Sequence, residues 1–170
     1  MERGRRWVQQ AFMAAAALAL GPSVARTGDD GWSVRLVFSF ERLAVQQTLA
    51  EAARRLDQPE CQALLDEFAN ASGQPLRSVL QESGLSAPEY LGGLFFYDAP
   101  PSLCGTSALA VTMPGSHVVF VCGARFVAQT RRNSRYAEAV LIHEALHSLG
   151  LGENPPSSDS ITERVRTRCG

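Results

Sequence analysis

The residues with the clearest chemical potential lie together in the stretch His143-Glu144-Ala145-Leu146-His147. If this stretch is helical, His143 and His147 lie one turn apart on one face, where their imidazoles can bind a single small cation. Imidazole nitrogen suits Zn²⁺, and a bound zinc ion lowers the pKa of its water toward about 7. Glu144 projects beside that water, so it can take a proton and later donate it to a leaving group. The pattern predicts a hydrolytic centre with one zinc ion per chain; the alternative is a helix with two hydrogen-bonded histidines and a surface glutamate.

The element that must position these residues is a helix over 135–149, the strongest helical pattern in the chain. Its apolar residues recur at helical spacing on one face, while Val140, His143 and His147 share another face. Gly150 follows directly, and glycine at this place commonly ends a helix in the left-handed conformation and turns the chain back. We therefore expect the two histidines to open onto a cleft.

Elsewhere, apolar spacing and turn residues predict several helices before a small sheet. Residues 33–40 alternate as an extended segment does, and Pro114-Gly115-Ser116 separates two β-rich runs, which predicts a hairpin. The order of elements predicts an α+β fold in one domain, with N-terminal helices, a short sheet or hairpin, the motif helix and a C-terminal helix. The expected helices are 41–56, 60–69, 76–81, one capped by Ser86, and one capped by Asp159 or Ser160 that runs to 168; the expected hairpin strands are 108–113 and 118–122.

The first 25 residues have the three-part pattern of a secretory signal peptide. Arginines precede an apolar run over 11–20, and small residues follow up to Ala25. The apolar run is too short for a membrane span, which needs about 20 residues. We expect segment 1–25 to be removed after Ala25 and the remaining domain, 26–170, to be secreted or periplasmic, with no membrane association.

The four cysteines all lie beyond the predicted signal peptide. An even number in an exported chain favours two disulfides, and the cysteines are spaced too widely for a typical zinc site. Three pairings are possible. We favour Cys61–Cys104 and Cys122–Cys169, because the second bond would tie the C-terminus to the segment before the motif helix.

The composition is that of a folded domain with no affinity for polyanions. Apolar residues make up 45% of the 170 residues and charged residues 19%. The 16 basic residues are balanced by 17 acidic ones. A nucleic-acid-binding protein normally has an excess of basic residues, so we expect no nucleic-acid partner. Separately, we expect the protein to be a monomer.

The residues from His143 to Glu153 resemble the metzincin branch of the zincin zinc metalloproteases. That branch has the pattern H-E-x-x-H-x-x-G-x-x-H, or Asp at the last place, whereas this chain has Glu153 there and no methionine after Gly150. The resemblance implies a small zincin-like domain, a peptide or protein substrate, and Glu153 as the third metal ligand. In the gluzincin branch a later helix supplies a glutamate, which makes Glu163 the alternative third ligand.

Three further residues are candidates for the site. The resemblance implies that the hairpin lies along the cleft and contacts substrate, so His117 would stabilise the transition state; otherwise it is a turn histidine. Tyr136 precedes His143 by seven positions and can reach the site or pack at the helix start. Asn154 can orient Glu153 or a metal-bound histidine, or it can serve the turn before two prolines.

Two functional hypotheses follow. The first is a secreted zinc-dependent peptidase in which Glu144 acts as general base and then general acid. The second is a secreted, disulfide-bonded zinc-binding domain without catalytic activity.

Overall fold

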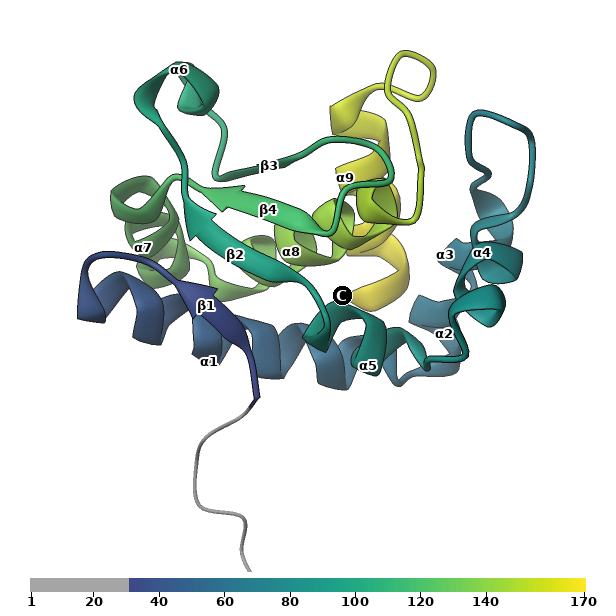
Figure 1. The fold of residues 1–170 in the computed structure, drawn as a ribbon, viewed down its shortest axis with the longest axis horizontal. Helices are drawn as coiled ribbons and strands as arrows, with labels where there is room; N and C mark the ends of the chain where they lie inside the picture. The colour runs from purple at the N-terminus through teal and green to yellow at the C-terminus, as the bar shows by residue number, and fades with distance from the viewer. Residues whose placement is uncertain (1–30) are drawn as a thin grey trace, which may run out of the picture.

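The computed structural model of the chain describes residues 31–170. The predicted signal peptide, 1–25, lies outside the described residues. A four-stranded mixed sheet lies against a layer of helices that includes α1, α7 and α8 (Figure 1). This arrangement confirms the predicted α+β class. The elements are β1 (Ser33–Arg35), α1 (Ser39–Leu56), α2 (Pro59–Gln62), α3 (Leu64–Glu67), α4 (Leu76–Ser83), α5 (Ala87–Gly92), β2 (Phe95–Asp98), α6 (Pro101–Cys104), β3 (Ala110–Thr112), β4 (Val118–Val121), α7 (Gly123–Arg132), α8 (Ser134–Ser148) and α9 (Ser158–Cys169).

The strand order in the sheet is β1-β2-β4-β3. β1 and β4 both pair with β2 in parallel, and β3 pairs with β4 in antiparallel, which confirms the predicted hairpin. β3 is therefore an edge strand. Alternation of side chains places Phe96 in the core, fully buried, while its neighbours Phe95 and Tyr97 face the other side and are exposed.

The motif helix α8 is buried over most of its length. Its residues from Ala137 to Ser148 are all buried, because α1, α7, α9 and β3 pack around it. The side chain of Asn133 caps its start by accepting a hydrogen bond from the Tyr136 N–H at 3.0 Å. The helix therefore holds its side chains in fixed positions, as a functional site requires.

The predicted helix over 60–69 is instead two short helices, α2 and α3. The Gln62 carbonyl accepts a hydrogen bond from the Arg77 guanidinium at 2.8 Å. The Asp66 N–H, which would bond to that carbonyl in a continuous helix, donates to Ala63 at 3.1 Å. A side chain from α4 thus interrupts the helix.

The ends of two other helices also bear on the predictions. Ser86 and Glu89 form the reciprocal capping box expected at the start of α5. The last helix starts slightly earlier than predicted, because its cap is Ser157, whose hydroxyl accepts from the Ser160 N–H at 3.3 Å, and not Asp159 or Ser160.

The two predicted disulfides are present, but the favoured pairing is wrong. Cys61 bonds to Cys169, and Cys104 bonds to Cys122. α9 packs back against α2, which brings the Cα atoms of the first pair to 4.5 Å, and the Cα atoms of Cys104, at the end of α6, and Cys122, which follows β4, are 5.7 Å apart. Two disulfides indicate an oxidising environment.

Among residues 31–170, no helix has the length and apolar character to cross a membrane.

Candidate metal centre

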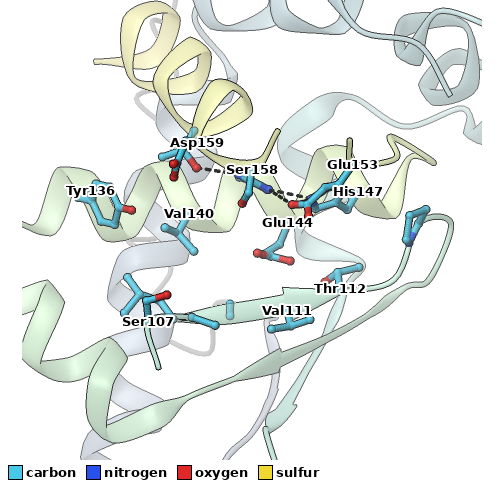
Figure 2. Close-up of a pocket in the computed structure, with 16 residues that line it drawn as sticks. Ser107, Val111, Thr112, Tyr136, Val140, Glu144, His147, Glu153, Ser158 and Asp159 are labelled. Atoms are coloured by element: carbon cyan, nitrogen blue, oxygen red, sulfur yellow. Dashed lines mark hydrogen bonds and ion pairs between the residues drawn. The ribbon is translucent and has the colours of Figure 1, made fainter. Parts of the chain in front are cut away.

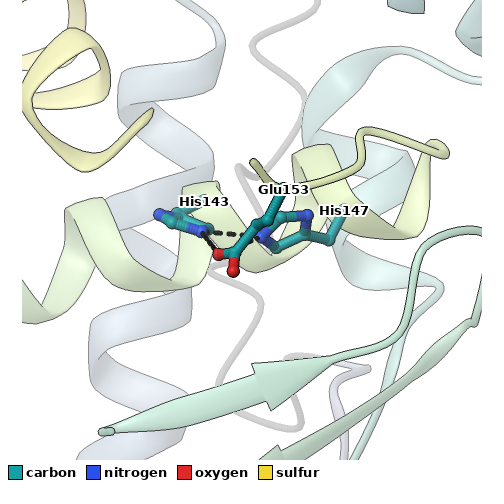
Figure 3. A group of neighbouring side chains, drawn as sticks. All are labelled: His143, His147 and Glu153. Carbon is teal, nitrogen blue, oxygen red and sulfur yellow. Dashed lines mark hydrogen bonds and ion pairs between the residues drawn. The ribbon is translucent and has the colours of Figure 1, made fainter. Parts of the chain in front are cut away.

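His143 and His147 face each other across one turn of α8, as their spacing predicts (Figure 3). Their Nε2 atoms are 2.8 Å apart, and each residue is only 4% exposed. Burial lowers the pKa of His143 to about 4, and the adjacent His147 adds to this effect. His143 is therefore neutral at physiological pH, which is the form that binds a metal.

The outer nitrogen of each ring has a hydrogen-bond partner. The Nδ1 atom of His147 lies 2.7 Å from the Leu151 carbonyl, which can only accept, so Nδ1 carries the hydrogen and Nε2 keeps its lone pair. The Nδ1 atom of His143 lies 2.9 Å from the Thr162 hydroxyl on α9. When that hydroxyl accepts, both Nε2 lone pairs point at the same place, an arrangement that a bound cation stabilises.

The turn after α8 brings the third candidate ligand over the histidines. Gly150 has the predicted positive φ, 102°, and its N–H donates to the His147 carbonyl at 2.8 Å. The Leu151 N–H donates to the Leu146 carbonyl at 3.1 Å, which completes a Schellman motif. The reversal of the chain also places the Leu151 carbonyl against His147.

Glu153 completes a group of three ligand atoms. Its Oε1 lies 3.2 Å from His147 Nε2 and 3.6 Å from His143 Nε2. All three atoms lie within 4.8 Å of one another, so this group could hold a metal ion, as predicted. Glu163 does not join the group, because its exposed carboxylate pairs with Arg166 at 2.9 Å.

Glu144 is buried beside this group, at 6% exposure. Burial raises the pKa of its carboxyl to about 8, the neighbouring Thr112 opposes this rise, and the carboxylate of Glu153 contributes to it. Its Oε2 has no hydrogen-bond partner in the described part of the chain. An unpaired buried carboxyl oxygen is costly, which indicates that a polar group or a water molecule meets it.

These side chains line a cavity of about 570 Å³ (Figure 2). Its walls are α8, the β3 edge and the start of α9. Ser158 and Asp159, at the start of α9, are among the lining residues. The lining residues are Ser107, Ala108, Leu109, Ala110, Val111, Thr112, Pro114, Tyr136, Val140, His143, Glu144, His147, Glu153, Ser158, Asp159 and Thr162.

Of the further candidates, the structure brings only Tyr136 to the cavity. His117 is not among the lining residues; its exposed ring lies edge-on to Tyr90, with ring centroids 5.7 Å apart. Asn154 occupies a turn, where it has a φ of 61° and its N–H donates to the Pro156 carbonyl at 2.7 Å. The turn interpretation of these two residues therefore fits the structure better than a role in the site.

Thr112 and Thr162 belong to the site but carry no local sequence signal. Each is a single threonine whose role depends on how β3 or α9 packs against α8. The role of the Leu151 carbonyl could not be predicted from the sequence either, because only the backbone path after Gly150 brings this carbonyl to His147.

Comparison with known protein families, curated proteins and solved structures finds no match to this chain. The resemblance to zincin proteases therefore stays a prediction from eleven residues, 143–153. What the chain does must be argued from the geometry of its site.

Proposed function

We propose that this protein is a zinc-dependent peptidase that acts in the periplasm or outside the cell. The proposal depends on one observation above all. Two imidazole nitrogens and a carboxylate oxygen converge within 4.8 Å at the wall of the cavity, beside the buried Glu144, whose Oε2 has no hydrogen-bond partner within residues 31–170. Two nitrogens and one oxygen are a common ligand set for catalytic zinc, which keeps a fourth position for water.

The residues have distinct roles in this proposal. His143, His147 and Glu153 would hold a zinc ion, which when bound would lower the pKa of a water molecule toward neutral. Glu144 is placed to accept a proton from the water that attacks the peptide carbonyl and to donate it to the leaving amine. The amine departs neutral, and the carboxylate is restored for the next cycle.

The edge strand supports a peptide as the substrate. The Cys122 N–H donates to the Leu109 carbonyl at 2.9 Å, so these two residues form a hydrogen-bonded pair at the end of the β3–β4 ladder. In an antiparallel pair the next residue points its backbone groups away from the partner strand. Ala110 and Thr112 therefore direct their N–H and C=O groups away from β4, and both residues line the cavity, where an extended peptide can add as a further strand.

The second candidate is a zinc-binding domain without catalysis. A structural zinc ion normally has a closed shell of four protein ligands. Within residues 31–170, the group contains three candidate ligands, and the side chain of Glu153 is 38% exposed. An open position facing a cavity favours the peptidase.

The test compares zinc content and proteolysis in matched variants. We expect the purified protein to bind one zinc ion per chain and to cleave dye-labelled casein. Glu144→Gln should retain zinc and lose activity by about a hundredfold or more. Glu163→Gln makes the same chemical change at an exposed glutamate outside the cavity and should leave both quantities unchanged.

Equal casein cleavage by the wild type and Glu144→Gln would contradict the proposed mechanism. Stoichiometric zinc with no cleavage by the wild type would favour the non-catalytic zinc-binding domain.

A further inference from the structure

Thr112 on β3 lies opposite Glu144 on α8, and both line the cavity (Figure 2). Thr112 is 8% exposed, and its Oγ1 has no hydrogen-bond partner within residues 31–170. The Oε2 atom of Glu144 has none either. The third buried side-chain atom without a partner in that part of the chain is Nε1 of Trp32, which is not in the cavity.

The two atoms are chemically complementary. A threonine hydroxyl can donate one hydrogen bond, and a carboxyl oxygen of glutamate can accept one. A buried hydroxyl without a partner is costly, whereas valine has the same shape and no such cost. A threonine at this place therefore needs a polar contact, and Glu144 is the acceptor that faces it.

We propose that Thr112 is a positioning residue whose hydroxyl donates a hydrogen bond to Oε2 of Glu144. The contact fixes the carboxylate on the side of the cavity where His143, His147 and Glu153 converge. The catalytic part of this inference rests on the proposed peptidase function, but the hydrogen bond itself requires neither zinc nor substrate.

The backbone around Thr112 is held against the helix that carries Glu144. In the turn that follows β3, the Gly115 N–H donates to the carbonyl of His147 at 2.9 Å. Thr112 is also paired with Val119 of β4 in the sheet. The strand and the helix are thus joined through a metal-ligand residue, so the distance between the two side chains is set by rigid elements.

A double-mutant cycle on stability tests the contact without any assay of activity. In the wild-type background, Thr112→Val should shift the unfolding equilibrium toward the unfolded state by roughly three- to tenfold. In the Glu144→Ala background the same substitution should have no destabilising effect. Thr48→Val removes another buried threonine hydroxyl, one that donates to the Ala44 carbonyl, and should show no coupling to Glu144→Ala.

An equal effect of Thr112→Val in both backgrounds, or stabilisation in the wild-type background, would overturn the proposal. The cycle separates this inference from the peptidase function. If the two substitutions are coupled but the protein cleaves no casein, the hydrogen bond is supported and the peptidase function is contradicted. If the protein cleaves casein but the substitutions are not coupled, the function is supported and the hydrogen bond is contradicted.

Kinetics of the zinc-loaded protein test the positioning role. Thr112→Val should lower kcat on dye-labelled casein by about tenfold with little change in KM, because only the base is misplaced. Thr112→Ser restores the hydroxyl and should recover most of kcat, with zinc content unchanged in both variants. A loss that serine does not rescue, or a loss confined to KM, would contradict the role.

Discussion

At the scale of single residues, the proposed metal centre depends on which nitrogen of each histidine carries its hydrogen. The Leu151 carbonyl settles this for His147, and the Thr162 hydroxyl can do so for His143. Partners of this kind hold the ring in the orientation that binding needs and make the coordinating nitrogen more basic. They are part of the site although they touch no metal.

This dependence gives a prediction for Thr162. Thr162→Val keeps the shape but removes the hydroxyl, so zinc affinity should fall by about tenfold or more, measured by competition with a chromophoric chelator. Thr167→Val is the matched control, because Thr167 lies on the same helix and its hydroxyl donates to the Glu163 carbonyl, away from the site. Equal affinities for all three proteins would show that the hydroxyl does not orient His143.

The sequence predicted the residues of the site that obey a local rule. His143 and His147 are linked by helical spacing, and Glu153 was expected from the resemblance of residues 143–153 to the metzincin pattern. Thr112 and Thr162 could not be found in this way, because each meets α8 from a separate element. Long-range packing decides which of the chain's threonines reach the site, and a single sequence contains no signal for it.

At the scale of elements, the turn after α8 is the part on which the site most depends. Gly150 has a φ of 102°, and a Cβ atom there would lie 3.1 Å from the Cβ of Asn70. Both facts disfavour any other residue at this position.

We therefore expect Gly150→Ala to destabilise the protein by about 1–2 kcal/mol. It should also weaken zinc binding, because the turn sets the position of Glu153. Gly152→Ala is the control, since a Cβ there meets open space. Chemical denaturation and chelator competition measure the two effects, and identical behaviour of the two variants would contradict this account of the turn.

The contact between α3 and α4 gives a prediction about pH. The hydrogen bonds from the Arg77 guanidinium lower the pKa of Asp66 from its ordinary value of 3.8. A lowered pKa means that the stabilisation is present above that ordinary value and is lost as the pH falls through the folded-state pKa.

Asp66→Asn should therefore reduce thermal stability at neutral pH, and the difference from wild type should shrink as the solution is acidified. Because this pair is exposed, high salt should reduce the difference as well. A difference that is the same at neutral and strongly acidic pH would show that the ion pair is not its source.

At the scale of the whole molecule, the two disulfides constrain the chain to very different extents. Cys61 and Cys169 are 108 positions apart, and their bond joins α2 to the end of α9. Cys104 and Cys122 are 18 positions apart. The entropy that a crosslink removes from the unfolded chain grows with the logarithm of the loop it closes.

Removing the long-range bond by Cys61→Ala with Cys169→Ala should therefore cost about 1.6 kcal/mol more than removing the short-range bond by Cys104→Ala with Cys122→Ala. Equilibrium unfolding of the two double variants measures the difference. A larger cost for the short-range bond would contradict this ranking.

The fold class could be predicted from the sequence, but the pairing of the strands and the contacts between distant helices could not. Apolar spacing indicated the helices, and Pro114-Gly115-Ser116 indicated the hairpin. The parallel pairing of β2 with β1 and β4, and the return of α9 to α2, depend on contacts between distant segments. The wrong disulfide pairing has the same origin, because cysteine positions alone do not reveal which helices meet.

The most direct test of the account is the position of a zinc ion in crystals of the zinc-loaded protein, located by anomalous diffraction at the zinc edge. The account predicts one peak bound by Nε2 of His143, Nε2 of His147 and the Glu153 carboxylate, with a water molecule in the fourth position facing Glu144. A peak elsewhere, or a fourth protein ligand that closes the site, would contradict it.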